Sequence, residues 1–499
     1  MVNAVAGSGK TTTLIEATKR INSKRVLFAA FNKHIVNDLK LRIANSSSCR
    51  TIHSIGYQCL RQMLGDKLQE AVNTKYRPLC RGIAARIHKN LEADYKYEFD
   101  AWLLRAVDED SDPPEEPPSI ELIQQQFYSL VDLSRVTLTP VMDLQRMENM
   151  AQHFAIDCPV ELSVVLTDLD YILTEGERLA RTEGKIDFAD MLWLPYQWKL
   201  KPYKYDWVLV DEAQDMNAAQ LHLVKKMATP QTRMLFVGDP KQAIYGFSGA
   251  DSESFETIRS DIEAQEFPLS ICYRCPKKVV ELAQLTVGEI HAKEDAPEGD
   301  ILVIEELDIM RHLLEQDLVL CRKTEPLVRL CLGLLAQKRK AAVKGKQIGK
   351  SLTSIIREVE KIEDFSFAKF QHFIDRYADA KIAKLRAKQD SESKIEDVND
   401  QLASIYTCYL AFNTTTLDAF VYELERLFSD DSSAITLSTI HRAKGLEAMR
   451  VFILEYDTLP LKWVNQKGWQ FEQENNLKYV AITRSKASLF LVNQRINIL

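Results

Sequence analysis

The sequence predicts an α/β protein with parallel sheets, and three observations support this prediction. Short apolar runs alternate with amphipathic helical stretches, which is the pattern of parallel α/β units. A glycine-rich loop at the start of the chain leads into a helical stretch, as in folds that cradle phosphate groups. Two long helical stretches interrupt the alternation, so we expect a phosphate-loop core that carries two helical insertions.

The glycine-rich loop at residues 4–12 reads Ala-Val-Ala-Gly-Ser-Gly-Lys-Thr-Thr and departs from the G-x-x-x-x-G-K-[ST] pattern only at Ala4. Glycines let backbone amides turn inward around phosphates, Lys10 reaches the β and γ oxygens, and the Thr11 hydroxyl can ligate Mg²⁺. We therefore predict that this loop binds ATP or a close relative. The residues predicted to hold the nucleotide are Ala6, Gly7, Ser8, Gly9, Lys10, Thr11 and Thr12.

A second predicted site follows the apolar run 207–210, which is short enough for a buried parallel strand and ends in carboxylates. Asp211 is placed to hold Mg²⁺ together with Thr11. Glu212 is expected on the other side of an extended chain, where it can orient or deprotonate the water that attacks the γ-phosphate. An acidic turn after a strand is common by itself, and the phosphate loop is what favours the catalytic interpretation.

Further strands are predicted wherever an apolar run is short and is followed by a helical pattern. The predicted strands are 25–31, 207–210, 234–237, 318–321, 451–454 and 488–492. About two hundred residues separate the loop from Asp211, more than a nucleotide-binding core needs there, so we expect an insertion between them.

Two helical stretches are predicted as insertions. The stretch 61–159 contains the acidic, proline-rich segment 108–118, which we expect to be a solvated loop. The stretch 352–433 is highly charged, and its residues Lys381, Lys384 and Lys388 recur at helical spacing. The face that they form is either simply solvated or binds nucleic acid.

The composition sets limits on the class of protein. With 499 residues, 46% of them hydrophobic, the chain can form several domains. It has no run of eighteen apolar residues and no leader pattern, so we expect neither a secreted nor a membrane-spanning protein. The nine cysteines are scattered, and the C-x-x-C of Cys272 and Cys275 has no partner pair at zinc-site spacing, which indicates reduced thiols. The net charge of −7 argues against a broad basic surface but permits a narrow basic channel.

Four further segments mix polar, aromatic and glycine residues in patterns that core elements do not show. They are 238–251 (GDPKQAIYGFSGAD), 269–276 (LSICYRCP), 439–447 (TIHRAKGLE) and 474–484 (ENNLKYVAITR). Together with the two sites above, they make the chain resemble superfamily 1 DNA helicases of the UvrD/Rep/PcrA type. The resemblance covers nearly the whole chain and is greatest to the branch with the F-box DNA helicases and many phage enzymes.

The resemblance implies two RecA-like core domains with parallel sheets, each interrupted by a mostly helical insertion, and ATP in the cleft between the core domains. The implied boundaries are 1–60 and 160–266 for the first core domain, 61–159 for its insertion, 267–351 and 434–499 for the second core domain, and 352–433 for its insertion.

The resemblance also implies roles around ATP. Gln242 matches the residue that senses the γ-phosphate, Tyr273 matches the one that stacks on adenine, and Glu447 matches the one that contacts the ribose. Arg274 and Arg484 match the arginines that reach the γ-phosphate, where they neutralise developing charge. The implied catalytic set is Glu212, Gln242, Arg274, Arg484 and Lys10.

This sequence departs from the family pattern at two places near the nucleotide. Cys272 stands where an asparagine usually precedes the tyrosine. Family members also carry an adenine-reading glutamine upstream of the loop, but only residues 1–3 precede Ala4 here. Either the chain starts late, or adenine is held mainly by stacking on Tyr273.

The resemblance places DNA contacts on several exposed or aromatic residues. They are Phe31, Asn32, His53, Tyr245, Phe247 and His441, with the segment 186–191 on the same path. An aromatic face such as that of Phe247 can stack on any base. Core packing stays an alternative for Phe247, and a structural hydrogen-bonded histidine is an alternative for His53.

The implied activity is that of an ATP-dependent helicase that moves 3′ to 5′ on single-stranded DNA and at single-strand/duplex junctions, with ATP and Mg²⁺ as cofactors. One alternative is a translocase that strips proteins such as recombinase filaments from DNA and unwinds little. The other is an ATP-gated scaffold with little hydrolysis. We expect an intracellular protein, cytoplasmic or at the nucleoid in bacteria or phage infection and nuclear in a eukaryote, with no membrane partner.

Overall fold

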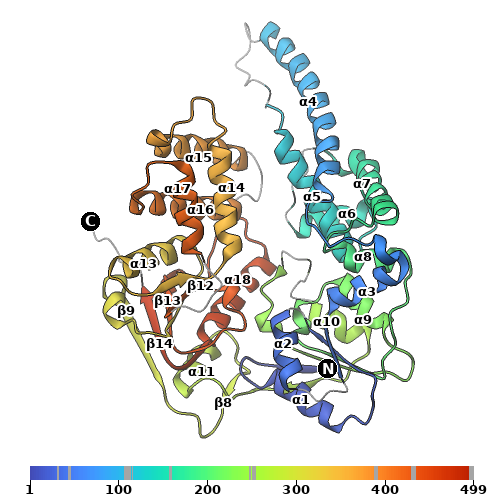
Figure 1. The fold of residues 1–499 in the computed structure, drawn as a ribbon, viewed down its shortest axis with the longest axis vertical. Coiled ribbons are helices and arrows are strands. Elements are labelled where there is room, and N and C mark those ends of the chain that lie inside the picture. Colours follow the sequence, from blue (N-terminus) through green and yellow to red (C-terminus); the bar gives the residue numbers. More distant parts are fainter. Residues whose placement is uncertain are drawn as a thin grey trace. The chain divides into compact units, whose positions relative to one another are not determined.

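The computed structural model describes most of the chain, and Figure 1 shows its fold. The described residues are 1–30, 33–42, 47–105, 114, 116–154, 156, 160–246, 249, 254–386, 392–428 and 434–493. The predictions for Phe31, Asn32, Phe247, Lys388 and most of segment 108–118 fall outside these residues.

The chain divides into two compact units. The first comprises Met1, Thr11–Gly238 and Tyr245–Gln265. The second comprises Val2–Lys10, Asp239–Ile244 and Glu266–Leu499. The glycine-rich loop up to Lys10 therefore belongs with the second unit, whereas Thr11 belongs with the first.

The first six-stranded sheet runs in the order β3-β2-β4-β5-β1-β6. Its strands are β1 (Val2–Ala4), β2 (Val26–Ala30), β3 (Ser47–Thr51), β4 (Trp207–Val210), β5 (Arg233–Gly238) and β6 (Phe267–Leu269). The pairs β2–β3, β2–β4, β4–β5 and β1–β6 are all parallel. The strand β2 is buried along its whole length, as expected for an apolar strand that is covered on both faces.

Of these strands, β2–β5 belong to the first unit and β1 and β6 to the second, and the first unit also contains helices. They are α1 (Lys10–Arg20), α2 (Lys33–Arg42), α3 (Ile52–Leu64), α4 (Arg77–Arg105), α5 (Ile120–Thr137), α6 (Leu144–His153), α7 (Leu162–Glu183), α8 (Asp190–Gln197), α9 (Ala218–Lys226) and α10 (Ser254–Asp261). One apolar cluster joins the sheet to its neighbouring helices, and a second joins α4–α8. The long helix α4 extends beyond the other helices of this unit (Figure 1).

The second unit contains a sheet in the order β11-β12-β10-β13-β14-β9, in which all neighbouring strands are parallel. Its strands are β9 (Asp300–Glu305), β10 (Leu318–Cys321), β11 (Ala341–Val343), β12 (Ile435–Thr439), β13 (Ala448–Leu454) and β14 (Ser485–Asn493). A short parallel pair, β7 (Ile271–Cys272) and β8 (His291–Ala292), lies apart from it.

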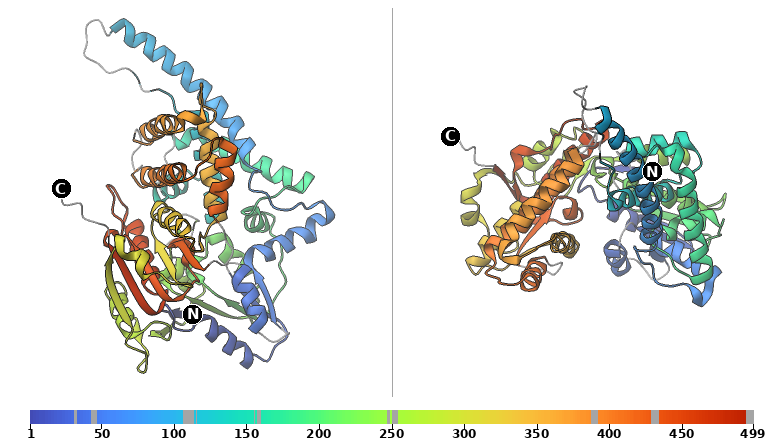
Figure 2. Two further views of the ribbon diagram at one scale, coloured as in Figure 1. Left: turned by 60° about the vertical axis from the view of Figure 1, so that its left-hand side comes forward. Right: turned by 90° about the horizontal axis from the view of Figure 1, so that it is seen from above.

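The helices of the second unit are α11 (Lys277–Gln284), α12 (Ile309–His312), α13 (Glu325–Ala336), α14 (Lys346–Val359), α15 (Phe370–Arg386), α16 (Glu392–Ala411), α17 (Leu417–Leu427) and α18 (Gly468–Ile482). Figure 2 shows α14–α17 side by side, in orange. Their apolar faces share one core with the second sheet, which includes Leu352, Phe370, Phe420, Leu437 and Phe452.

The structure confirms the predicted α/β class with parallel sheets. Each predicted strand is present, with shifts of one to three residues at the ends of some. The helices α4–α6 occupy the stretch 61–159, and α14–α17 start at Lys346 and end at Leu427. The precise domain boundaries stay a prediction. The helix α7 lies beyond residue 159, yet it shares the apolar cluster of α4–α6.

The cysteines and the helices agree with the expectations from composition. Every cysteine that the structure describes is free and buried, including Cys272 and Cys275. None of the described helices combines the length and the apolar character that a membrane span requires.

Candidate nucleotide-binding site

The glycine-rich loop joins β1 to α1 and has the backbone of a phosphate cradle. Gly7 and Gly9 have φ angles of +68° and +89°, which side-chain-bearing residues rarely adopt. A Cβ atom on Gly7 would also lie 2.7 Å from Cβ of Arg274 and 2.8 Å from Sγ of Cys272. Glycine is therefore required at this position by both the backbone and the space around it.

The loop presents polar atoms and is anchored from another part of the second unit. The Ser8 hydroxyl is buried and has no hydrogen-bond partner among the described residues. The buried amide of Ala6 donates a 2.9 Å hydrogen bond to the hydroxyl oxygen of Tyr479 on α18. Burial raises the pKa of Tyr479, so that its hydroxyl stays protonated at neutral pH. An unpaired buried hydroxyl in a glycine-rich turn fits a bound phosphate group.

A chain of polar contacts runs from the loop to the end of α18. The Lys10 ammonium lies 4.0 Å from the Asp239 carboxylate, and both side chains are largely buried. Asp239 accepts a 2.7 Å hydrogen bond from the side-chain amide of Gln242, whose carbonyl oxygen accepts one of 3.3 Å from Arg484. The structure thus brings together three residues, Lys10, Gln242 and Arg484, that the sequence predicts from three separate motifs.

The end of α18 holds Arg484 in place. Its Nε donates to the carbonyl oxygen of Val480 at 2.8 Å, and a terminal nitrogen donates to the Thr483 hydroxyl at 3.2 Å. Only 2% of Arg484 is exposed. The guanidinium is therefore preorganised beside Gln242, which is the condition under which a cation stabilises developing charge effectively.

A second group of charged side chains includes Arg274, which lies close to Gly7 of the loop. Nε of Arg274 is 2.6 Å from the Glu447 carboxylate, and Lys486 is 2.5 Å from its other oxygen. Burial alone would raise the pKa of Glu447, but the Lys486 hydrogen bond and the Arg274 charge lower it, so Glu447 is ionised. The amide of Tyr273 donates to the carbonyl oxygen of Gly7 at 2.9 Å, and 63% of Tyr273 is exposed. An exposed ring fixed to the loop by its backbone can stack on a base.

In the first unit, Thr11 and Asp211, which are predicted to hold Mg²⁺, lie in contact. The Thr11 hydroxyl donates to Asp211 at 3.0 Å, and Asp211 is 2% exposed at the end of β4. Mg²⁺ usually takes one or two protein oxygens and completes its shell with phosphate and water. A hydroxyl and a carboxylate in contact fit that ion.

The expectation of an extended chain at Glu212 is wrong. Glu212 has a φ angle of +53° and a ψ angle of +46°, a left-handed conformation that turns the chain into a short 3₁₀ turn (Ala213–Asp215). Its carboxylate accepts a 2.5 Å hydrogen bond from the Gln214 side chain. A non-glycine residue in this conformation stores strain of about 1–2 kcal/mol, which is typical of a functional position.

The predicted DNA contacts are only partly described. His53 lies in the first turn of α3, and its ring is 6.4 Å from that of Phe188, edge to face. Burial lowers the pKa of His53. Tyr245 is half-buried. Burial and the nearby Arg322 charge lower the pKa of His441 to about 3, so its ring is neutral at pH 7. Phe31, Asn32 and Phe247 lie outside the described residues.

Sequence reasoning assigned no role to Asp239 or Tyr479, although both stand in segments that it singled out. Asp239 directly follows β5 just as Asp211 directly follows β4, so the position of carboxylates at the ends of parallel strands was an available signal. No local signal marks Tyr479, because its contact with Ala6 joins residues that are 473 positions apart.

The comparisons with known proteins agree with this geometry. The UvrD/REP helicase N-terminal domain family matches residues 1–263. A probable DNA helicase II homologue of Mycoplasma pneumoniae is 24% identical over 99% of this chain and 81% of its own length. The F-box DNA helicase protein 1 of Schizosaccharomyces pombe is 24% identical over 98% of this chain, which spans 55% of that relative. The ATP-dependent DNA helicase PcrA of Bacillus subtilis is 21% identical over 100% of this chain and 81% of its own length.

Proposed function

Since the chain belongs to the UvrD/REP helicase family, we propose that it is an ATP-dependent DNA helicase that moves 3′ to 5′ along single-stranded DNA. The observation that carries this proposal is the continuous set of contacts Lys10–Asp239–Gln242–Arg484. It joins the phosphate loop to a buried arginine through the glutamine that follows β5. Such a connection lets the state of the γ-phosphate influence residues on both sides of Gln242.

The residues of the second unit suit the binding and cleavage of a nucleoside triphosphate. The amides of the glycine-rich loop and the Ser8 hydroxyl take the phosphates, and Lys10 neutralises their charge. Arg484 and Arg274 stabilise the charge that develops on the transferring phosphoryl group. The exposed ring of Tyr273 stacks on the base, while Glu447, ionised beside Arg274 and Lys486, accepts hydrogen bonds from the ribose.

The residues of the first unit suit a magnesium ion and the attacking water. Thr11 and Asp211 would hold Mg²⁺, which neutralises charge on the phosphate oxygens when it is bound. Glu212 orients the water and accepts its proton, and Gln214 holds the Glu212 carboxylate in place. Hydrolysis needs a bound nucleotide and an activated water. The loss of Glu212 removes only the activation of the water, so it stops turnover without removing the nucleotide contacts.

Single-stranded DNA is the proposed substrate, together with its junctions with duplex. Aromatic faces bind bases without regard to sequence, as a motor that moves along any sequence requires. The proposed contacts are Phe31, Asn32, His53, Tyr245, Phe247 and His441, together with Phe188, which is 50% exposed. Nucleotide states that differ in affinity for the strand convert hydrolysis into movement.

One observation favours the alternative of a translocase that strips proteins from DNA. The alignment with Bacillus subtilis PcrA spans 631 positions, more than the 499 residues of this chain, so that relative contains segments without a counterpart here. Segments that engage duplex DNA are candidates for the difference, and their lack would weaken unwinding before it weakens movement on a single strand.

The first experiment is steady-state ATP hydrolysis with and without poly(dT), with Lys10→Ala and Glu212→Gln as controls. We expect strong stimulation by the single strand and its loss in both variants, while Glu212→Gln keeps nucleotide binding. Hydrolysis that does not respond to poly(dT) would refute the DNA motor, and little hydrolysis with intact ATP binding would favour a gated scaffold.

A second experiment separates unwinding from stripping and tests polarity. Duplexes with a 3′ tail or a 5′ tail are presented bare and with a bound protein on the tail. We expect unwinding from the 3′ tail only. Clearance of the bound protein without strand separation would replace unwinding by stripping, and activity on the 5′ tail alone would reverse the proposed direction.

A further inference from the structure

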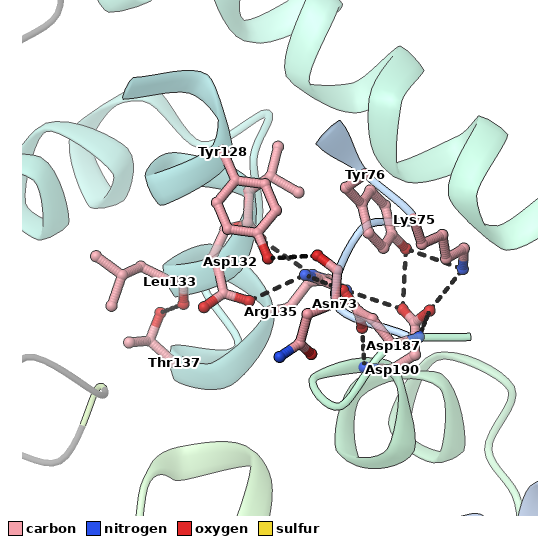
Figure 3. A network of polar contacts seen from close by, with 12 residues as sticks. Asn73, Lys75, Tyr76, Tyr128, Asp132, Leu133, Arg135, Thr137, Asp187 and Asp190 are labelled. Atoms are coloured by element: carbon pink, nitrogen blue, oxygen red, sulfur yellow. Dashed lines mark hydrogen bonds and ion pairs between the residues drawn. The ribbon is translucent and has the colours of Figure 1, made fainter. Parts of the chain in front are cut away.

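A buried network of charges lies in the first unit (Figure 3). The Arg135 guanidinium contacts both carboxylate oxygens of Asp187, at 2.8 and 2.9 Å, and one oxygen of Asp190 at 3.0 Å. The Lys75 ammonium lies 2.5 Å from the other oxygen of Asp190. The side chains of all four residues are at most 3% exposed.

Tyr76 completes this network. Its hydroxyl donates a 2.9 Å hydrogen bond to Asp190, and the Arg135 guanidinium lies over its ring at 4.0 Å. At the rim, Asp132 pairs with Arg135 at 3.0 Å. Burying this many charges is expensive, and a well-packed apolar cluster of similar volume often stabilises a fold equally well or better. The network therefore calls for an explanation other than stability, and geometric specificity is the available one.

The geometry that the network determines is that of the turn between Asp187 and Asp190. The amide of Asp190 donates to the Asp187 carboxylate at 2.8 Å, and the amide of Asp187 donates to the Asp190 carboxylate at 3.1 Å. Both carboxylates are thus shared between the turn's own backbone and the cations of the network. Neither can rotate without breaking contacts on both sides.

Between these two buried aspartates, Phe188 is 50% exposed. Its ring lies 6.4 Å from that of His53, edge to face. A half-exposed apolar side chain between two immobilised residues takes its direction from the backbone of the turn. Its orientation depends on the contacts that fix Asp187 and Asp190.

We propose that Arg135 and Lys75 are positioning residues that hold the 187–190 turn so that Phe188 stands at the surface as a stacking platform for a nucleobase. This inference rests on the proposed DNA-dependent function. Arg135 belongs to α5, and Lys75 lies just before α4, so both cations come from the predicted insertion 61–159. The insertion thereby sets the position of a DNA contact on the core through buried charge, without touching the DNA with these residues.

The reference for the experiment is Phe188→Ala, measured by the affinity for a fluorescent oligo(dT) and by the DNA concentration that gives half-maximal ATPase stimulation. Removal of a stacking aromatic weakens single-strand binding by about 5- to 150-fold. The test variant is Lys75→Met, which keeps the length of the side chain but removes the charge that pairs with Asp190. Thermal unfolding and the ATPase rate without DNA are recorded for each protein.

We expect Lys75→Met to weaken oligo(dT) binding by a factor approaching that of Phe188→Ala and to leave the ATPase rate without DNA unchanged. When Lys75→Met is combined with Phe188→Ala, the DNA affinity should fall little further, because Lys75 acts on DNA binding through the Phe188 ring. Arg86→Met is the matched control, since Arg86 pairs with Asp168 at the surface of the same group of helices. Arg86→Met should bind DNA normally.

Three outcomes would overturn the inference. The first is Lys75→Met with normal DNA affinity, whatever its melting temperature, and the second is an equal loss with and without Phe188. The third is that DNA stimulates the wild-type ATPase while Phe188→Ala binds oligo(dT) with unchanged affinity. This outcome refutes the stacking platform but leaves the proposed function standing. If Lys75→Met does not fold, Arg135→Lys, which keeps the charge but loses the paired contact with Asp187, takes the same test.

Discussion

The hydroxyl of Tyr479 offers the sharpest test of how the phosphate loop is held. Tyr479→Phe removes one oxygen atom and keeps the ring, so it leaves the packing of α18 nearly unchanged. The amide of Ala6, a residue with no exposed surface, then loses its 2.9 Å acceptor. The experiment therefore isolates a single hydrogen bond between residues 473 positions apart in the chain.

The expected magnitude follows from that burial. A buried amide that loses its acceptor and cannot reach water costs about 1–3 kcal/mol. The free energy of unfolding should fall by this amount, and nucleotide binding should weaken by about fivefold or more, since the loop is no longer held in its binding conformation.

The assay is urea unfolding followed by circular dichroism, with a parallel titration of a fluorescent ATP analogue. Tyr422→Phe is the control, because Tyr422 is 62% exposed and lies on α17. An unfolding free energy of Tyr479→Phe equal to that of the wild type would refute the reasoning. A loss of the same size in Tyr422→Phe would show that the measured loss does not come from the buried amide.

Two further predictions concern packing and pH. Gly56→Ala should destabilise the first unit severely, because its Cβ would lie 1.7 Å from the carbonyl oxygen of Met191, whereas Gly82→Ala, with open space around it, should stabilise α4 by about 0.5–1 kcal/mol. Melting temperatures of both variants check this, and equal effects would contradict it. The pKa of His441 lies at about 3 in the folded chain and near 6.5 when unfolded, so the unfolded state binds more protons between these values and stability falls as the pH drops below 6.5. Between pH 7 and pH 5, the free energy of unfolding should fall by about 2 kcal/mol because of His441. Urea titrations of His441→Asn should show a correspondingly flatter pH dependence of this free energy.

The local features of the chain were predictable from the sequence alone. The apolar run that forms β2 is buried along its whole length, and a short apolar run flanked by helical patterns admits few other structures. The glycine positions in the loop follow from the conformations that only glycine adopts freely, as the φ angles of Gly7 and Gly9 bear out. Lys10, Gln242 and Arg484 were named from motifs, and the structure brings them together.

The error at Glu212 has a physical cause. Strand periodicity describes an extended backbone, but β4 ends at Val210, and the chain turns at Glu212 with a positive φ. A glutamate in a left-handed conformation cannot be read from residue spacing, because the surrounding structure has to supply the free energy that the strain requires.

The sequence by itself determined the class of fold, the strands β2, β4, β5, β10, β13 and β14, and the chemistry of the phosphate loop, because these depend on residues close together in the chain. Only the tertiary structure decided that Tyr479 anchors Ala6 and that Arg135 and Lys75 share Asp187 and Asp190. These contacts join residues 52 to 473 positions apart, and a buried polar group accepts any partner of suitable charge that the fold brings near. The packing of the whole unit decides which partner each buried polar group meets. No local sequence pattern carries that information.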